Sequence, residues 1–321
     1  MIPYVREIEF DYGQVRQVSP LIRRVIAKNP GPFTYTGTGT YIIGHGDGVA
    51  VIDPGPDMPE HLQAILDAVA HERVSHILVT HHHADHSPLA RPLAAATGAV
   101  VYGCAVKELP REGDVKLEAG YDRFSPDVSV CDGTTIAGHG WTFEAIPTPG
   151  HTSNHICYAL NEENACFTGD HIMGWSTTVV TPPDGNMGDY LASLALIRSR
   201  NFTTLWPTHG PPITDVPAFL DAYRDHRLDR ERQILAQLEA GETRIKQMVP
   251  KMYVGVNPGL YPAASHSVLA HMIELVRSGR VATSGAAGID SDYRLAEIQT
   301  EKGAPLPGAP CSRSSSPGLD G

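Results

Sequence analysis

Cysteine is scarce in this chain of 321 residues, and its five cysteines form no Cys-x-x-Cys pair and no regular spacing. That pattern argues against a disulfide framework. We therefore expect reduced thiols at Cys104, Cys131, Cys157, Cys166 and Cys311.

Long apolar runs and an excess of positive charge are also missing. No apolar stretch is long enough to cross a membrane, and the first residues carry charges where a signal peptide would need an apolar core. We therefore expect a cytoplasmic protein with no membrane segment. The formal net charge of −11 does not indicate a general nucleic-acid-binding surface, although it does not exclude a local basic groove.

A dense group of histidines follows a predicted strand. The apolar run 77–79 is typical of a buried strand, and His81, His83 and Asp85 occupy alternate positions after it, with His86 next to Asp85. Imidazoles and a carboxylate at this density offer the nitrogen and oxygen ligands that suit zinc. His82 lies on the opposite parity, so we expect it to be a buried structural residue.

The segment before this group predicts a βαβ unit. Residues 40–53 predict a hairpin with a glycine-rich turn, and residues 62–69 predict an amphipathic helix. Asp57 and Glu60 ahead of the helix resemble a capping box. The histidine loop then falls at the carboxyl end of a strand, where open α/β sheets place their sites.

Three later residues have similar surroundings. His151, Asp170 and His209 each lie where a short apolar run meets glycine, which is typical of a ligand on a loop at a strand end. His155 follows His151 by four residues, and we expect it to orient a ligand rather than to bind metal.

The C-terminal third changes to helical periodicity. Residues 219–235 predict a charged helix that links two domains, and residues 245–252 and 268–276 predict two more helices. Segments 280–283 and 293–295 could pair as strands, which gives the order of a winged-helix-like module. The arginines of the linking helix alternate with acids, so we expect a solvated or interdomain face rather than an RNA track.

Together the motifs resemble the metallo-beta-lactamase superfamily over roughly residues 35–215. The matching elements, in order, are His81-x-His83-x-Asp85-His86, Thr-Pro-Gly-His151-Thr, Phe-Thr-Gly-Asp170 and Thr-His209-Gly.

The linking helix carries His226-Arg227-x-x-Arg230, which, with the winged-helix-like end, is similar to the branch named beta-lactamase-like protein 2. That branch includes endoribonucleases acting on single-stranded RNA. Leu89 stands where glycine is expected in this branch.

The resemblance implies an α/β fold, the αβ/βα metallo-beta-lactamase sandwich with a small C-terminal winged-helix-like domain. We expect a catalytic domain over residues 1–215 and a helical, winged-helix-like domain over residues 216–300. Residues 301–321 are rich in Pro, Gly and Ser without periodicity and predict a disordered tail.

The resemblance also implies a site for two Zn²⁺ ions. By motif, His81, His83 and His151 would hold one ion, Asp85, His86 and His209 the other, and Asp170 would bridge them. Two zinc ions about 3.5–4 Å apart would supply a bridging hydroxide at neutral pH. Asp85 would be the catalytic residue that orients it.

Several substrates fit this chemistry. The leading prediction is a phosphodiester of single-stranded RNA, and the alternative is a small thioester or ester, with beta-lactam hydrolysis as a side activity. A non-enzymatic alternative is a metal-loaded scaffold whose winged helix binds nucleic acid or a partner. An electron-transfer di-iron protein would more typically have glutamate where His83 stands. The sequence leaves the oligomeric state open.

Overall fold

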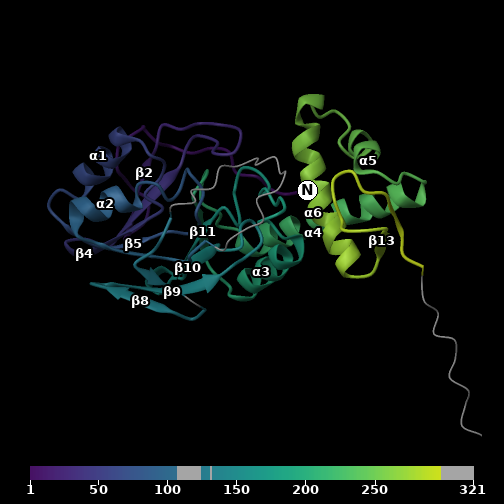
Figure 1. The fold of residues 1–321 in the computed structure, drawn as a ribbon. Helices are drawn as coiled ribbons and strands as arrows, with labels where there is room; N and C mark the ends of the chain where they lie inside the picture. Colours follow the sequence, from purple (N-terminus) through teal and green to yellow (C-terminus); the bar gives the residue numbers. More distant parts are fainter. Residues whose placement is uncertain (107–123, 131, 298–321) are drawn as a thin grey trace, which may run out of the picture.

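Two β-sheets lie face to face, with helices on their outer faces and a further group of helices to one side (Figure 1). The structure is a computed structural model that describes residues 1–106, 124–130 and 132–297. The tail predicted over residues 301–321 lies outside this range.

The first sheet, within the described residues, has seven strands in sequence order. Neighbours pair antiparallel from β1 to β4 and parallel from β4 to β7, so the predicted hairpin and βαβ unit are both confirmed. The strands are β1 (Arg16–Gln17), β2 (Ile22–Ile26), β3 (Gly39–Ile43), β4 (Asp47–Ile52), β5 (Arg73–Leu78), β6 (Val100–Gly103) and β7 (Val128–Ser129).

Two helices, α1 (Pro59–Ala68) and α2 (Ala90–Thr97), cover the outer face of this sheet. The predicted capping box before α1 is wrong, because the helix begins after Met58 and no side chain caps it. Proline at the first helical position supplies the start instead, since its fixed φ is preorganised for a helix.

The second sheet has the strand order β12-β11-β10-β9-β8. The β11–β12 pair is parallel and the other pairs are antiparallel. Its elements are β8 (Thr135–Gly138), β9 (Trp141–Pro147), β10 (Ile156–Leu160), the 3₁₀ turn η1 (Asn161–Glu163), β11 (Ala165–Gly169), β12 (Thr204–Pro207) and the covering helix α3 (Met187–Ser199).

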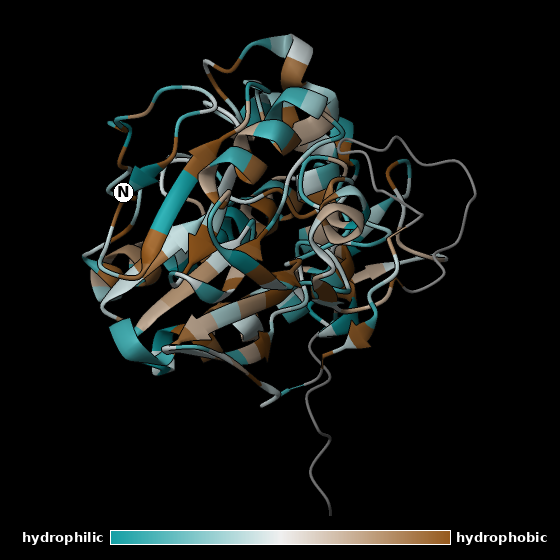
Figure 2. Cartoon of the chain, turned by 90° about the vertical axis from the view of Figure 1, so that its left-hand side faces the viewer, coloured by the Kyte–Doolittle hydropathy of each residue, from teal (hydrophilic) through white to brown (hydrophobic). Residues whose placement is uncertain are grey.

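Aromatic side chains fill the space between the sheets. The Phe143 ring is fully buried, with its centroid 5.4 Å from that of Trp141, 6.3 Å from Tyr158 and 5.8 Å from Phe167. Figure 2 shows hydrophobic residues concentrated on the strands in the interior. The layer order helix, sheet, sheet, helix confirms the predicted αβ/βα sandwich.

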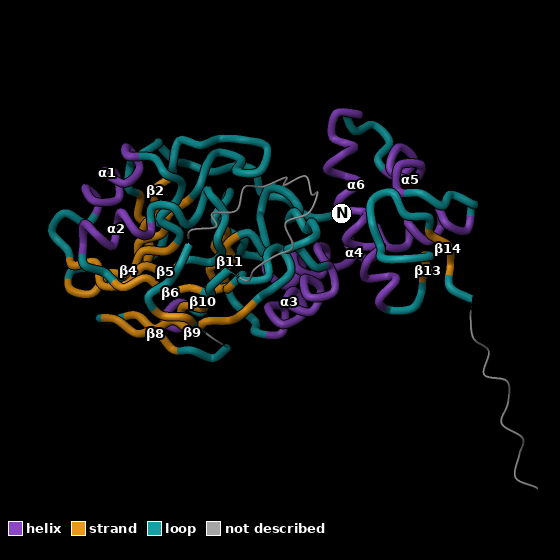
Figure 3. The backbone as a smooth tube through the Cα atoms, viewed as in Figure 1, coloured by secondary structure: helices purple, strands orange, loops and turns teal. Residues whose placement is uncertain are grey.

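The C-terminal elements form a hydrophobic core of their own. Helices α4 (Val216–Glu239), α5 (Ile245–Met252) and α6 (Tyr261–Arg277), with the 3₁₀ turn η2 (Pro258–Leu260), precede an antiparallel pair of β13 (Val281–Thr283) and β14 (Tyr293–Leu295) (Figure 3). This order of helices and hairpin confirms the winged-helix-like module. The boundary near residue 215 stays a prediction.

The two parts share one apolar cluster. Ala270 of α6 packs with residues of α3 and α4, and Ile2 near the N-terminus joins the same cluster. No helix among the described residues combines the length and apolar character needed to cross a membrane.

Removing the aromatic ring of Phe143 should open a cavity between the sheets. We expect Phe143→Ala to lower the free energy of unfolding by about 3–5 kcal/mol, measured by urea denaturation. The control Leu196→Ala removes a half-exposed side chain on α3 and should have a much smaller effect. Equal effects would contradict the assigned core.

Candidate metal centre

All seven predicted ligands come together where strands of both sheets end. Four of them follow β5, and the other three follow β9, β11 and β12. Their nitrogen and oxygen atoms form three groups with all members within 4.8 Å: His81, His83 and His151; His81, His86 and Asp170; and Asp85, His86 and His209.

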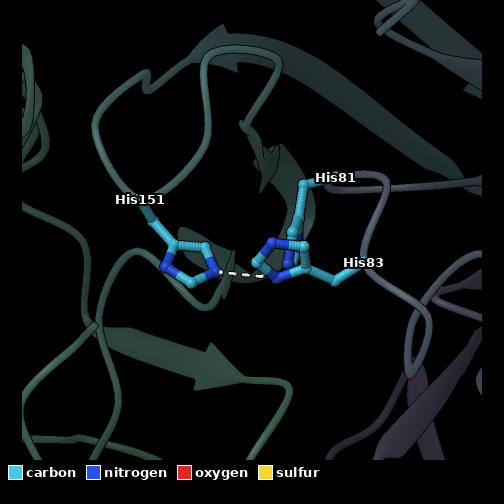
Figure 4. A group of neighbouring side chains, drawn as sticks. All are labelled: His81, His83 and His151. Atoms are coloured by element: carbon cyan, nitrogen blue, oxygen red, sulfur yellow. Dashed lines mark hydrogen bonds between the residues drawn. The ribbon is translucent and has the colours of Figure 1, made fainter. Parts of the chain in front are cut away.

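The first group consists of three buried imidazoles from two loops. Figure 4 shows the His151 ring facing those of His81 and His83, and Nε2 of His151 lies 3.2 Å from Nδ1 of His83. His151 Nδ1 donates to the carbonyl of Val179 at 2.6 Å, which leaves Nε2 as the nitrogen available to a metal.

Asp170 lies between the first group and the third. Its Oδ1 is 3.5 Å from Nε2 of His86 and 3.4 Å from Nε2 of His209, whereas Oδ2 is 3.9 Å from Nε2 of His151. Each carboxylate oxygen therefore faces a different set of histidines, which is the arrangement a bridging ligand needs.

Buried atoms at the centre converge without making hydrogen bonds, which tests whether a metal fits. Within the described part of the chain, Nε2 of His81, His86 and His209 and Oδ1 of Asp170 are buried without a hydrogen bond. Buried polar atoms are nearly always satisfied, so these convergent atoms point to an ion. Imidazole and carboxylate ligands fit zinc among other divalent metals.

The pKa values divide the histidines into two sets. Burial, reinforced by neighbouring imidazoles, lowers the pKa of His81 and His83 well below the usual value. Burial also opposes the charged form of His86, but the carboxylates of Asp85, Asp170 and Asp53 raise its pKa well above normal. The pKa of His209 is raised by Asp170 and Asp85 against the effect of burial.

Asp85 is the most exposed of the seven side chains, with 27% of its surface accessible, and its Oδ2 lies 3.1 Å from Nε2 of His209. Burial works to raise the pKa of Asp85, but His86 and His209 hold it well below the usual value. The carboxylate is therefore ionised and open to a substrate or water.

Asp53 is a site residue that the sequence reasoning missed. It is fully buried after β4, and its Oδ2 accepts from Nδ1 of His86 at 2.9 Å and from the hydroxyls of Thr80 and Thr208 at 2.8 Å. Its Oδ1 accepts from the amide of Thr80 at 2.8 Å. The sequence signal that could have found it is an acid at the end of β4, the strand parallel to β5 and next to it.

The structure supports the predicted roles of His82 and His155 and shows that the loop at Leu89 has no need of glycine. His82 is buried, and its Nδ1 lies 3.0 Å from Oδ1 of Asn154. His155 Nε2 accepts a hydrogen bond from the amide of Asp170, so it holds a ligand candidate in place. Leu89 has a φ of −75°, which any residue adopts, so that loop does not require glycine.

Comparison with known proteins identifies the family. Residues 36–209, more than half of the chain, match the metallo-beta-lactamase superfamily. The chain belongs to this superfamily. Residues 245–289 match the beta-lactamase associated winged helix domain, so the superfamily fold is followed by the winged-helix domain that the resemblance implied. With its histidine and aspartate cluster, the chain is a metallo-beta-lactamase-fold hydrolase.

Curated relatives cover most of the chain. An atrochrysone carboxyl ACP thioesterase of Aspergillus chevalieri is 35% identical over 70% of this chain and 68% of its own length. A beta-lactamase-like protein 2 homolog of Caenorhabditis elegans is 34% identical over 71% of this chain and 74% of its own. This confirms the resemblance to that branch of the superfamily.

A solved structure shares the fold across nearly the whole chain. The crystal structure of a beta-lactamase domain protein from Burkholderia ambifaria superposes with a TM-score of 0.76 over 92% of this chain and 97% of its own. At 19% sequence identity, this superfamily relative supports the fold alone.

Zinc uptake should release protons, because His86 and His209 have raised pKa values and must lose their protons to bind a metal. As pH rises through those raised values the competing protons leave, so zinc affinity should increase, by about tenfold per pH unit for each proton displaced. Calorimetric titration in buffers of different ionisation enthalpy counts the protons. His45→Gln, at an exposed histidine, is the control; uptake without proton release would contradict the assignment.

Asp53→Asn should weaken zinc binding, because an amide nitrogen facing His86 or the threonine hydroxyls cannot replace the carboxylate as an acceptor. We expect a loss of about 10–100-fold in affinity for one ion, measured by chelator competition. Asparagine tolerates the φ of +46° found here. Thr208→Val removes one donor and keeps the His86 contact, so an equal loss in this control would exclude orientation of His86 as the cause.

Proposed function

We propose that the protein is a dinuclear zinc hydrolase whose substrate is a small acyl thioester or ester. His81, His83 and His151 would hold one ion, Asp85, His86 and His209 the other, and Asp170 would bridge the two. The observation that carries the proposal is the position of Asp170, whose two oxygens face different histidine sets.

Two bound zinc ions would supply hydroxide at neutral pH, because they lower the pKa of water toward about 7. Asp85 is placed to orient the attacking water, since it is ionised and the most exposed of the seven ligands. Asp53 and His155 contribute by fixing His86 and Asp170, so the reacting groups need little reorganisation.

The charge distribution favours an acyl substrate. Arg24 and Arg227 are buried and donate to the backbone carbonyls of Gly210 and Thr178, so neither is presented to a phosphate. Four basic side chains of the C-terminal part are paired with carboxylates: Arg244 with Asp292, Lys251 with Glu242, Arg277 with Glu274 and Arg280 with Glu231. A thioesterase is also among the curated relatives.

Single-stranded RNA is the second candidate. The observation in its favour is the 34% identity with the beta-lactamase-like protein 2 homolog, whose branch implies this substrate. Beta-lactam hydrolysis would be a side activity, and a metal-loaded scaffold is the non-enzymatic alternative. The cytoplasmic location stays a prediction.

Zinc-loaded protein should hydrolyse an acyl thioester and lose that activity on chelation. Asp85→Ala should reduce turnover by about 10²–10⁴-fold, the usual range for a positioned acid or base. Asp170→Ala should also lower the zinc content. Asp57→Ala, at an exposed acid before α1, is the control and should behave as wild type.

Parallel assays on labelled single-stranded RNA and a chromogenic beta-lactam distinguish the alternatives. RNA cleavage that is absent from Asp85→Ala and falls steeply with added salt would transfer the assignment to RNA. Turnover that survives complete metal removal would overturn the mechanism. Two bound zinc ions without turnover of any substrate would favour the scaffold.

A further inference from the structure

The segment between β11 and α3 begins with the ligand candidate Asp170 and reaches the metal centre again, farther along, through a backbone carbonyl. Val179 accepts a hydrogen bond from Nδ1 of His151 at 2.6 Å. The position of this carbonyl therefore decides which nitrogen of His151 faces the centre and how the ring is turned.

Helix α4 holds this segment with two side chains on one face. The Tyr223 hydroxyl donates to the carbonyl of Met173 at 3.0 Å and accepts from its amide at 3.2 Å. Four residues later, and so on the same side of the helix, the Arg227 guanidinium donates to the carbonyl of Thr178, next to Val179.

The surroundings fix the conformation of Thr178. Its hydroxyl donates to the carbonyl of His171 at 2.9 Å, and the Tyr190 hydroxyl donates to the same carbonyl, also at 2.9 Å. The Tyr190 ring in turn lies beneath the Arg227 guanidinium, whose central carbon is 5.0 Å from the ring centroid. Arg227, Tyr190 and Thr178 thus form one connected set behind His151.

A buried arginine at position 227 is not explained by packing alone. Its side chain is 3% exposed, and no carboxylate of the described residues forms an ion pair with it. Burying a cation costs free energy that an apolar side chain of similar length would avoid. Its contacts with one carbonyl and one ring are directional, which suits a positioning role.

We propose that Arg227 is a positioning residue for the metal centre. By holding the carbonyl of Thr178, it places the adjacent carbonyl of Val179 so that His151 presents Nε2 to the ion. This connects the helix that leads into the winged-helix domain with a metal ligand. The inference rests on the proposed metal centre and not on any particular substrate.

The test compares Arg227→Met with Arg230→Met. Arg230 lies on the same helix and makes the same kinds of contact, with its guanidinium carbon 4.2 Å from the Tyr253 ring centroid and a hydrogen bond to the carbonyl of Met252. Those contacts lie inside the winged-helix part. The control therefore removes the same kinds of contact at a place that does not touch the segment behind His151.

We measure zinc affinity by chelator competition and the visible spectrum of the cobalt(II)-substituted protein. Arg227→Met should weaken one of the two metal sites by about 10–100-fold and change the cobalt spectrum, as loss of a ligand-orienting contact does elsewhere. Arg230→Met should leave both readouts at wild-type values even where its melting temperature falls. Arg227→Lys keeps the cation over Tyr190 and should restore part of the affinity.

Wild-type affinity and spectrum in Arg227→Met would overturn the proposal, and so would equal changes in Arg230→Met. If Arg227→Met does not fold, Arg227→Lys decides: a shifted spectrum supports the proposal and an unchanged one overturns it. Wild-type protein that takes up no metal would instead refute the proposed metal centre. Failure to turn over thioester or RNA would not affect the zinc affinity or the cobalt spectrum, so this inference would still hold.

Discussion

The buried carboxylate of Asp53 is the constraint on which the metal edge depends. It lies at the end of β4 and accepts hydrogen bonds from residues that follow β5 and β12, strands that belong to different sheets. A buried anion is tolerated only when its oxygens are well satisfied, so its donors must keep their positions. His86 is one of these donors, so a residue of the β-sandwich holds a proposed metal ligand in place.

The proposed ligands could be found in the sequence because each of them has a local signal. His81, His83, Asp85 and His86 are adjacent in sequence, and the others lie at the junction of an apolar run and a glycine. Strand ends of an α/β sandwich meet at one edge, so such residues converge whenever the strands are assigned correctly.

The residues behind the ligands could not be found in the same way. Asp53 stands in an Asp-Pro-Gly turn, where an acid needs no further explanation. Arg227 belongs to a helix of alternating charges, yet it is buried while its neighbour Arg224 is exposed. Only the packing of that helix on a segment distant in sequence separates the two arginines.

The proposed ligands come from four loops spread over much of the chain, and for a bound metal this arrangement has a thermodynamic consequence. An unfolded chain can offer a metal ion little more than the first histidine motif, whereas the folded chain offers all seven groups together. By mass action, a ligand that prefers the native state stabilises it in proportion to the logarithm of its free concentration. With a metal bound at the proposed centre, the resistance of this protein to unfolding would depend on the free metal concentration around it as well as on its own packing.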